Sequence, residues 1–417
     1  MIGITPVFHA LGGGPLRLVG AGVLSGALGF TRASSGLALG TDGVLLGAYA
    51  AGVPRFQGAA QRLLVEGART NTIRNPRVEG AVAGSPGTVP TNWTVSALSG
   101  TTRTLDIGTS PTPGLPFLSV RIQGTPTAAG YFTIQPEVAS TAVSPAAVGQ
   151  VWTFSCWVRL AAGSLPAGSN HRLRLQERGG ATTPATDMSF TPGTAWQRIV
   201  ATRVLSEPGT TYLQHSILPF LAAGTAADLT LQVTGVQAEA GGFVSSPILP
   251  AVGSSAASGR VADVAALALG TAQAASGSLV GTFMLPAVGT AAGDVQGLLV
   301  LDDGTDGNRF GLVKPGGGAA LVPFRSIGGS LATGAGIQTL VPGTAVRVAL
   351  AWSAGGIAAC CNGGAVVSLS GAIPAVSRLL IGHGASSLGQ AAFGEAGPLD
   401  LHPTRLPDAG LQALTLT

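Results

Sequence analysis

The sequence predicts an all-β protein with two β-sandwich or jelly-roll domains in series behind an N-terminal β-hairpin arm. Three observations support this: turn-forming residues are abundant, apolar residues are plentiful, and apolar and polar residues alternate along short segments. The 417 residues include 64 glycines and 27 prolines. These disfavour long helices, because glycine loses much entropy in a helix and proline lacks an N–H donor. Apolar residues make up 46% of the chain and charged residues 10%, so intrinsic disorder is not expected.

The first 68 residues are predicted to form an arm, because they contain too little apolar sequence for a core of their own. The stretch from Gly29 to Phe56 reads as two short strands around a turn at Thr41, Asp42 and Gly43, where the Asp-Gly pair supplies positive φ angles. Such an arm must dock on something. Three receivers are open: the next domain, a neighbouring subunit or the wall of a particle. We favour an arm that anchors the protein to a particle.

Residues 69–258 are predicted to form the first sandwich, a jelly roll, because their side chains alternate with a period of two. In the segment VWTFSCWVRL, Phe154 and Cys156 point to one side of the strand, and Trp157 and Arg159 point to the other. Sheets with one apolar and one polar face stack into sandwiches. Connectors rich in proline and glycine occur at the spacing that a jelly roll needs.

A linker rich in Pro, Ala, Ser and Gly runs from Pro247 to Gly259 and predicts a domain boundary. Residues 259–417 are then predicted to form a second sandwich of short apolar strands, with a hairpin turn at Asn362–Gly363. Near the end, LPDAGLQALT predicts one short helix, with Leu411 and Leu414 on one face.

Several classes of protein are not expected. No window offers the ~20 unbroken apolar residues of a membrane-spanning helix, and the N-terminus lacks the basic region of a signal peptide. The +4 formal charge comes from dispersed arginines and the single lysine, Lys314, so nucleic acid is not an expected partner. Cys156, Cys360 and Cys361 do not form a disulfide framework. The adjacent pair is expected to point to opposite faces of its strand.

We expect the protein not to be an enzyme and to need no cofactor. The sequence lacks the HExxH, GxSxG, Walker and GxGxxG motifs. A hydrolase with two carboxylates far apart in the sequence is an open alternative, although acidic residues are sparse and most fall in turns. The histidines are scattered, which predicts surface or turn positions for His9, His171, His215, His383 and His402.

The acidic loop LDDGTDGNRF is a candidate calcium site. Hard oxygen ligands suit Ca²⁺, and four are near one another in the sequence: Asp302, Asp303, Asp306 and Asn308. Their spacing does not match an EF-hand, and a hairpin turn rich in Asp, Gly and Asn explains the same residues. We favour the plain turn and keep the calcium site as the alternative.

Sugar binding is the chemistry that the aromatic and arginine residues suggest. A pyranose has an apolar face and a ring of hydroxyls, so its site needs an aromatic platform flanked by planar polar groups. Tryptophans and arginines on predicted polar faces or beside turns meet this need, with Gln232 as a further polar group. The candidates are Trp157, Arg159, Arg172, Arg174, Trp93 and Trp196. The alternative is that the tryptophans pack in the core or at a subunit interface.

Several stretches resemble segments of phage head spike fibre proteins, a family also found in gene transfer agents. They are LLVEGARTNTIRNPRVEGAVAGSPGTVPTNWTV, the upstream FTRASSGLALGTDGVLLGAYAAGVPRF and the later VQAEAGGFVSSPILP. The C-terminal GPLDLHPTRLPDAGLQALT is similar to part of a concanavalin/laminin-G sandwich. The resemblance implies a jelly roll like a carbohydrate-binding module over residues 69–258, and a concanavalin/laminin-G-like sandwich over 259–417.

The same resemblance implies a non-enzymatic virion protein: a head spike or fibre, of a tailed phage or gene transfer agent, that contacts host surface polysaccharide. Made in the bacterial cytoplasm and displayed on the particle, it would be a homo-oligomer, either a trimer or a vertex-matched pentamer. Residues 1–68 would contact a capsid or tail protein, and repeated copies would turn weak sugar contacts into avidity. The alternatives are a tail-associated receptor-binding fibre, a polysaccharide depolymerase and an architectural particle component without a ligand.

Overall fold

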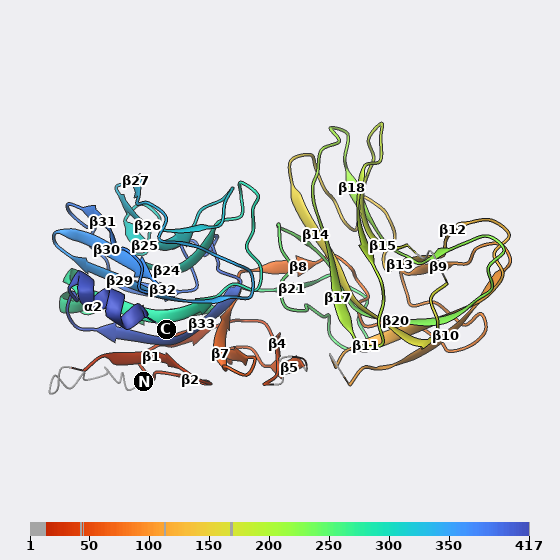
Figure 1. The fold of residues 1–417 in the computed structure, drawn as a ribbon, viewed down its shortest axis with the longest axis horizontal. Coiled ribbons are helices and arrows are strands. Elements are labelled where there is room, and N and C mark those ends of the chain that lie inside the picture. Colours follow the sequence, from red (N-terminus) through yellow and green to blue (C-terminus); the bar gives the residue numbers. More distant parts are fainter. Residues whose placement is uncertain (1–13, 42–43, 45, 112–113, 167–169, 417) are drawn as a thin grey trace. The chain divides into compact units, whose positions relative to one another are not determined.

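The computed structural model confirms the all-β prediction (Figure 1). It describes residues 14–41, 44, 46–111, 114–166 and 170–416. The predicted turn at Asp42 and Gly43 lies outside the described residues. Those described form antiparallel sheets and two short helices, α1 (Thr271–Ala275) and α2 (Asp408–Thr415). No helix in the ranges given above is long and apolar enough to cross a membrane.

The chain folds as two compact units, and one is discontinuous in sequence. Unit 1 takes its residues from 1–43, 48–68 and 261–417, and unit 2 takes its residues from 44–47 and 69–260. Unit 2 therefore interrupts the sequence of unit 1. Its ends are neighbours, because β8 (Arg69–Asn71) pairs antiparallel with β21 (Ser258–Arg260).

Unit 1 is a sandwich of two sheets. One sheet has the order β2-β1-β33-β23-β29-β30-β31, and β7 pairs with both β33 and β6. Its strands are β1 (Leu16–Gly20), β2 (Val23–Leu24), β6 (Arg55–Gln57), β7 (Arg62–Val65), β23 (Gly277–Met284), β29 (Ala345–Ser353), β30 (Gly356–Cys361), β31 (Val367–Ser370) and β33 (Gly394–His402).

The other sheet of unit 1 has the order β27-β26-β25-β24-β32-β22-β3, with β28 paired to β26. Its strands are β3 (Gly29–Thr31), β22 (Val264–Ala268), β24 (Gln296–Asp302), β25 (Arg309–Lys314), β26 (Ala320–Ile327), β27 (Ser330–Thr333), β28 (Gln338–Thr339) and β32 (Arg378–Ile381). Two short strands, β4 (Gly36–Leu39) and β5 (Leu46–Tyr49), lie outside both sheets.

The core of unit 1 lies between these sheets and follows from the period-two pattern. Along β29, Val348, Leu350 and Trp352 point into it. The opposite face of the same sheet carries small residues, onto which α2 packs Leu411. The adjacent cysteines obey the same rule, as predicted: Cys361 belongs to the inner core, and Cys360 lies on the face that α2 covers.

The described part of the N-terminal segment pairs with strands of its own chain and belongs to unit 1. Its role in anchoring the protein to a particle stays a prediction. β1 and β7 both pair with β33, and β3 pairs with β22. Apolar side chains of the segment join the core of unit 1: Leu18, Val19, Leu28, Leu63 and Val65. The segment has too little apolar sequence to form a core alone, and it completes a sandwich whose other strands lie more than 190 residues later in the chain.

Unit 2 is also a sandwich of two sheets. The first sheet has the order β10-β11-β20-β14-β17, and the second has the order β16-β15-β18-β13-β9. The strands are β9 (Thr94–Ser96), β10 (Thr101–Thr109), β11 (Pro116–Gly124), β13 (Thr133–Gln135), β14 (Val151–Gly163), β15 (His171–Arg178), β16 (Ala185–Phe190), β17 (Gln197–Val204), β18 (Tyr212–Leu218) and β20 (Ala227–Ala240). Two further short strands, β12 (Gly130–Tyr131) and β19 (Phe220–Leu221), pair with each other in a separate two-stranded sheet.

The predicted alternation in unit 2 is confirmed on both sheets. On the first sheet, Phe154 and Cys156 of β14 and Leu231 of β20 belong to the core, and on the second sheet Leu173 and Leu175 of β15 do. The opposite faces of both sheets carry polar and aromatic side chains. The first sheet's outward face holds the candidate site.

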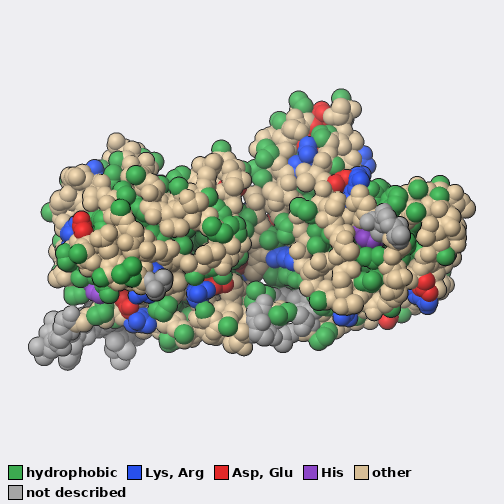
Figure 2. All heavy atoms as spheres, viewed as in Figure 1, with side chains coloured by type: hydrophobic (Ala, Val, Ile, Leu, Met, Phe, Trp, Pro, Cys, Tyr) green, Lys and Arg blue, Asp and Glu red, His purple; other side chains and the backbone are tan. Residues whose placement is uncertain are grey.

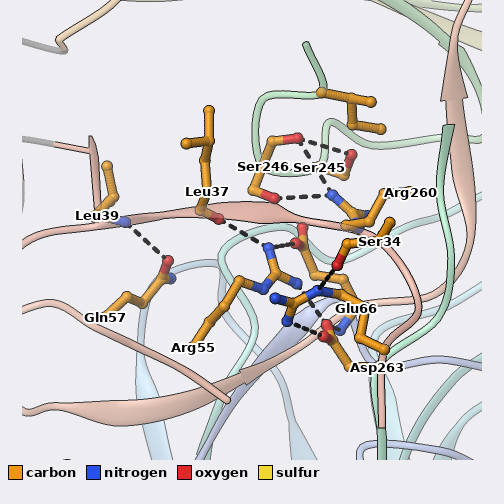
Figure 3. A network of polar contacts seen from close by, with 12 residues as sticks. Ser34, Leu37, Leu39, Arg55, Gln57, Glu66, Ser245, Ser246, Arg260 and Asp263 are labelled. Carbon is orange, nitrogen blue, oxygen red and sulfur yellow. Dashed lines mark hydrogen bonds and ion pairs between the residues drawn. The ribbon is translucent and has the colours of Figure 1, made fainter. Parts of the chain in front are cut away.

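A network of buried charges ties the N-terminal segment to the rest of unit 1 (Figure 3). The carboxylate of Asp263 accepts hydrogen bonds from Arg32, at 2.9 Å, and from Arg55. Arg55 also forms an ion pair with Glu66 at 2.8 Å. Burial works to lower the pKa of Arg55, but Glu66 and Asp263 outweigh it and raise that pKa. The side chains of Arg32, Arg55 and Asp263 are fully buried.

Deleting residues 1–68 is expected to unfold unit 1 and leave unit 2 folded. The deletion removes β1 and β7 from the edge of β33 and takes away core side chains that are each worth about 2–5 kcal/mol, against a total stability of about 5–15 kcal/mol for a domain. Hydrogen exchange measured by mass spectrometry would separate the two units. Unchanged protection of the β23 and β33 amides from exchange in the truncated protein would contradict this prediction. It would show that unit 1 folds without residues 1–68.

Replacing Asp263 with Asn is expected to lower the free energy of unfolding of unit 1 by about 3–5 kcal/mol, because two buried guanidinium groups lose their shared carboxylate. Urea titration followed by hydrogen exchange in β22 and β33 would measure the change. Asp400→Asn is the matched control. Its partner Arg17 has a side chain 55% exposed, so that change should cost less than about 1 kcal/mol. Equal losses in the two variants would show that the buried network has no special role.

Candidate functional site

A row of side chains crosses the outward face of the first sheet of unit 2. Phe117 of β11 is the register partner of Thr234 of β20, which is a partner of Trp157 of β14, which is a partner of Arg198 of β17. A parallel row contains Gln232 of β20 and Arg159 of β14. Trp196 comes directly before β17. We call these the aromatic–arginine face: Phe117, Trp157, Arg159, Trp196, Arg198 and Gln232.

Trp157 is held in place from two sides. The guanidinium of Arg198 lies over its ring, 4.2 Å from the ring centre. The ring also lies against Gly235, where a Cβ atom would come within 2.7 Å of it. Gly235 has φ +57° at the register shift between β14 and β20, a conformation that glycine adopts without strain. Trp157 therefore serves more as a support for Arg198 than as a free platform.

Arg198 is anchored by hydrogen bonds within unit 2. Its Nη1 donates to the carbonyl of Ser245 at 2.9 Å, and its Nη2 donates to the hydroxyl of Ser155 at 3.1 Å. The sequence interpretation did not include Arg198. The signal was present, since Trp196 and Arg198 are two residues apart and a strand of period two places both on one face.

Arg159 and Trp196 form the second half of the face. The Arg159 guanidinium lies 5.1 Å from the centre of the Trp196 ring, and its Nε donates to Gln232 Oε1 at 2.8 Å. Phe117 packs against Trp196 with ring centres 6.2 Å apart and an angle of 48°. The sequence interpretation also missed Phe117, because the sequence of a strand does not show which other strands it pairs with. All six side chains are half-buried, so their groups are ordered but reachable.

The indole N–H of Trp196 is buried without a hydrogen-bond partner in the part of the chain that the structure describes. An unpaired buried donor costs about 1–3 kcal/mol. Such groups are rare in folded proteins. The ring that carries this donor is the one over which the Arg159 guanidinium lies.

Arg172 and Arg174 do not join this face. They belong to β15 on the second sheet, where both form ion pairs with Asp187 of β16, at 2.9 and 2.7 Å. The hydrogen bonds and charges of these arginines lower the pKa of Asp187 despite its burial. Arg172 also lies over the Tyr131 ring at 5.2 Å. These two arginines are neutralised within the protein and are weaker candidates for a ligand.

Trp93 does not belong to the candidate face and takes the alternative position, in the core. Trp93 is 5% exposed and belongs to the core of unit 2, and its Nε1 donates to the carbonyl of Asn75 at 3.0 Å. The preceding residue, Asn92, has φ +71°. The turn expected there is present, but it directs the indole inward.

The carboxylates of the acidic loop have separate partners. Asp302 is buried and binds Arg378, Asp303 accepts from Thr305 and Asn308, and Asp306 accepts from the Ser387 N–H and forms an ion pair with Arg309. No group of three or more His, Cys, Asp or Glu side chains among the described residues is arranged to hold a metal ion. The loop thus has the internal hydrogen bonds of an Asp-rich turn.

Several titratable groups are buried and uncharged at neutral pH. The prediction of surface or turn positions is wrong for His171, His215 and His383, which are all buried; His9 lies outside the described residues. His215 packs in the core against Phe154, with ring centres 5.1 Å apart. Burial lowers the pKa of His215 to about 3 and raises the pKa of Cys156 to about 12. With these pKa values the His215 imidazole is a weak base and the Cys156 thiol is not ionised near pH 7.

Unit 1 has an apolar groove of about 650 Å³ between α1 and residues 372–377. Its walls include Leu269, Ala274, Ile373 and Val376, and Thr271 and Ser377 also line it. Among the described residues, no charged side chain lines it. It lacks the convergent polar groups that fix a ligand's orientation.

No family model matches the chain, and no curated protein matches it. Solved structures show weak likenesses. The CBM40 of Ruminococcus gnavus IT-sialidase bound to alpha2,3 sialyllactose has 17% identity and a TM-score of 0.27, over 35% of this chain and 85% of that one. The tandem CBM22 domains of Paenibacillus barcinonensis Xyn10C have 12% identity and a TM-score of 0.26, over 79% and 99%. Trypanosoma rangeli sialidase in complex with the inhibitor DANA has 10% identity and a TM-score of 0.30, over 76% and 62%. At these TM-scores, no property of those proteins transfers to this chain.

Proposed function

We propose that this protein is a non-enzymatic component of a phage-type particle and that unit 2 binds host surface polysaccharide through the aromatic–arginine face. The observation that supports sugar binding is the convergence of three aromatic rings, two guanidinium groups and an amide on one outward sheet face. Aromatic rings contact the apolar face of a pyranose, and planar donors pair with its hydroxyls.

The face supports modest affinity in each copy. Arg198 covers one side of Trp157 and Arg159 covers one side of Trp196, which leaves aromatic edges and polar groups for contact. A homo-oligomer, trimeric or matched to a fivefold vertex, would present several such faces to one polysaccharide. Several linked sites bind far more tightly than one, because each further contact is made at a high effective concentration.

The resemblance to head spike fibre proteins supports the particle role, whether the host particle is a tailed phage or a gene transfer agent. In this proposal unit 1 attaches to a capsid or tail protein through residues 1–68. β2 is the edge strand of its sheet, and its Val23 is 58% exposed. Edge strands offer unpaired backbone groups to another chain, so this edge suits attachment.

Trp196→Ala is expected to weaken binding to host surface polysaccharide by about tenfold or more, as removal of a central aromatic contact commonly does. Tyr131→Ala, which removes an aromatic ring beside the second sheet, is the matched control and should leave affinity nearly unchanged. Calorimetric titration with extracted polysaccharide would measure both. Equal affinities for all three proteins would contradict the proposed site, and new reducing ends released on incubation would contradict the non-enzymatic role.

The particle role has its own test. The protein is expected to co-purify with particles produced by its host, and electron microscopy of particles bearing a tagged copy should show it at symmetry-related surface positions. Particles from a host strain that lacks the gene for this protein are the control, because they show which surface features belong to other proteins. A protein that remains in the cell lysate as an isolated monomer, and never sediments with particles, would contradict this role.

A further inference from the structure

We propose that the sugar bound by the aromatic–arginine face is acidic and that its carboxylate pairs with Arg159. This inference rests on the proposed sugar binding and names the class of sugar. It starts from the electrostatic state of Arg159, which has no carboxylate partner among the described residues, unlike Arg121, Arg172, Arg174 and Arg203.

Four of the eight arginines on the strands of these sheets form an ion pair with a carboxylate. Arg121 pairs with Asp228 at 2.9 Å, and Arg203 pairs with Glu177 at 2.6 Å. Arg172 and Arg174 share Asp187. Arg159 has neutral partners among the described residues, the Gln232 amide and the Trp196 ring, as Arg178 has the Gln214 amide. Among the described residues, no carboxylate lies within ion-pair distance of it.

A half-buried guanidinium without a counter-charge is poorly solvated and gains most from an anionic ligand. Taking a charge out of water is costly unless an opposite charge compensates it. Hydrogen bonds from a guanidinium to a carboxylate are also stronger than those to a neutral hydroxyl. The environment of Arg159 therefore favours a carboxylated sugar over a neutral one.

The geometry leaves the right atoms for this contact. Arg159 uses its Nε for Gln232, which fixes the guanidinium plane over Trp196. The two Nη groups are the donors that remain for a ligand, and together they can hold one carboxylate. With the carboxylate at Nη, the sugar ring would lie beside Trp196 and Phe117, which supply the apolar surface.

The distribution of charge along the chain points the same way. Residues 69–260 contain twelve arginines and eight acidic residues, a formal charge of +4, and the whole chain has the same +4. The charges outside 69–260 therefore cancel. The excess positive charge lies on the unit that carries the face, where it attracts anions over a distance of about 10 Å in 0.1 M salt.

The test compares acidic polysaccharides with their own carboxyl-reduced products, which have the same backbone without the charge. Polygalacturonate, hyaluronate and extracted host polysaccharide are each titrated with the full-length protein before and after reduction. A neutral polysaccharide and a DNA duplex are included. The expected result is binding to at least one acidic polysaccharide that weakens about tenfold or more on carboxyl reduction. It should also weaken several-fold between about 0.05 M and about 0.5 M NaCl.

Arg159→Gln removes the charge and keeps a planar donor beside Gln232, and it should lose about tenfold or more in affinity for the acidic form only. Arg121→Gln changes the net charge equally, on the same sheet, at an arginine already paired with Asp228. It should change affinity less than about twofold. Thermal unfolding of both variants confirms that they remain folded, and the salt series on the unchanged protein tests the inference without a variant.

The outcomes separate the two proposals. Equal binding of an acidic polysaccharide and its reduced product, or binding of neutral polysaccharide alone, overturns the acidic sugar and leaves sugar binding intact. Equally tight binding of the DNA duplex, with the same loss in Arg159→Gln, overturns it in favour of nonspecific polyanion binding. If no polysaccharide in the panel or from the host binds, the proposed sugar-binding function itself fails.

Discussion

The buried carboxylate of Asp263 is the contact on which the architecture depends. It follows the interruption in unit 1 and binds Arg32 and Arg55, which precede it. Its Oδ2 also accepts the Glu66 N–H at 2.9 Å. None of these groups is stable in the interior without the others, so both parts of unit 1 must be present before either is folded. Residues 69–260 of unit 2 are thus inserted between two segments of unit 1 that pair with each other.

The site depends on a different constraint, the register of four strands. The row from Phe117 to Arg198 crosses β11, β20, β14 and β17, and a shift by one residue in any of them would turn its side chain into the core. The core side is filled by Phe154, Cys156 and Leu231, which fixes that register. Figure 2 shows that charged side chains are few and scattered on the visible face of each unit.

The alternation of side chains was readable from the sequence because it depends only on neighbours in the chain. It gave the two sandwiches, the outward position of Trp157 and Arg159, and the opposite faces of Cys360 and Cys361. Pairings over long distances were not readable. The contact of β1 with β33 joins residues nearly 400 positions apart, which is why residues 14–68 looked like an arm. The position of Trp93 could not be read for a local reason: the sequence shows the turn beside it but not the direction in which the turn points its side chain. Arg198 was within reach through its spacing from Trp196.

The pairing of β8 with β21 places Arg69 and Arg260, the two ends of the long segment of unit 2, on neighbouring strands, which lie about 5 Å apart in a sheet. A domain whose ends are this close can be exchanged for another with the same spacing, because the host scaffold has only to tolerate a loop at that position. Recombination at residues 69 and 260 would thus replace the outward sheet face in a single step, while the buried charges of the scaffold stay as they are.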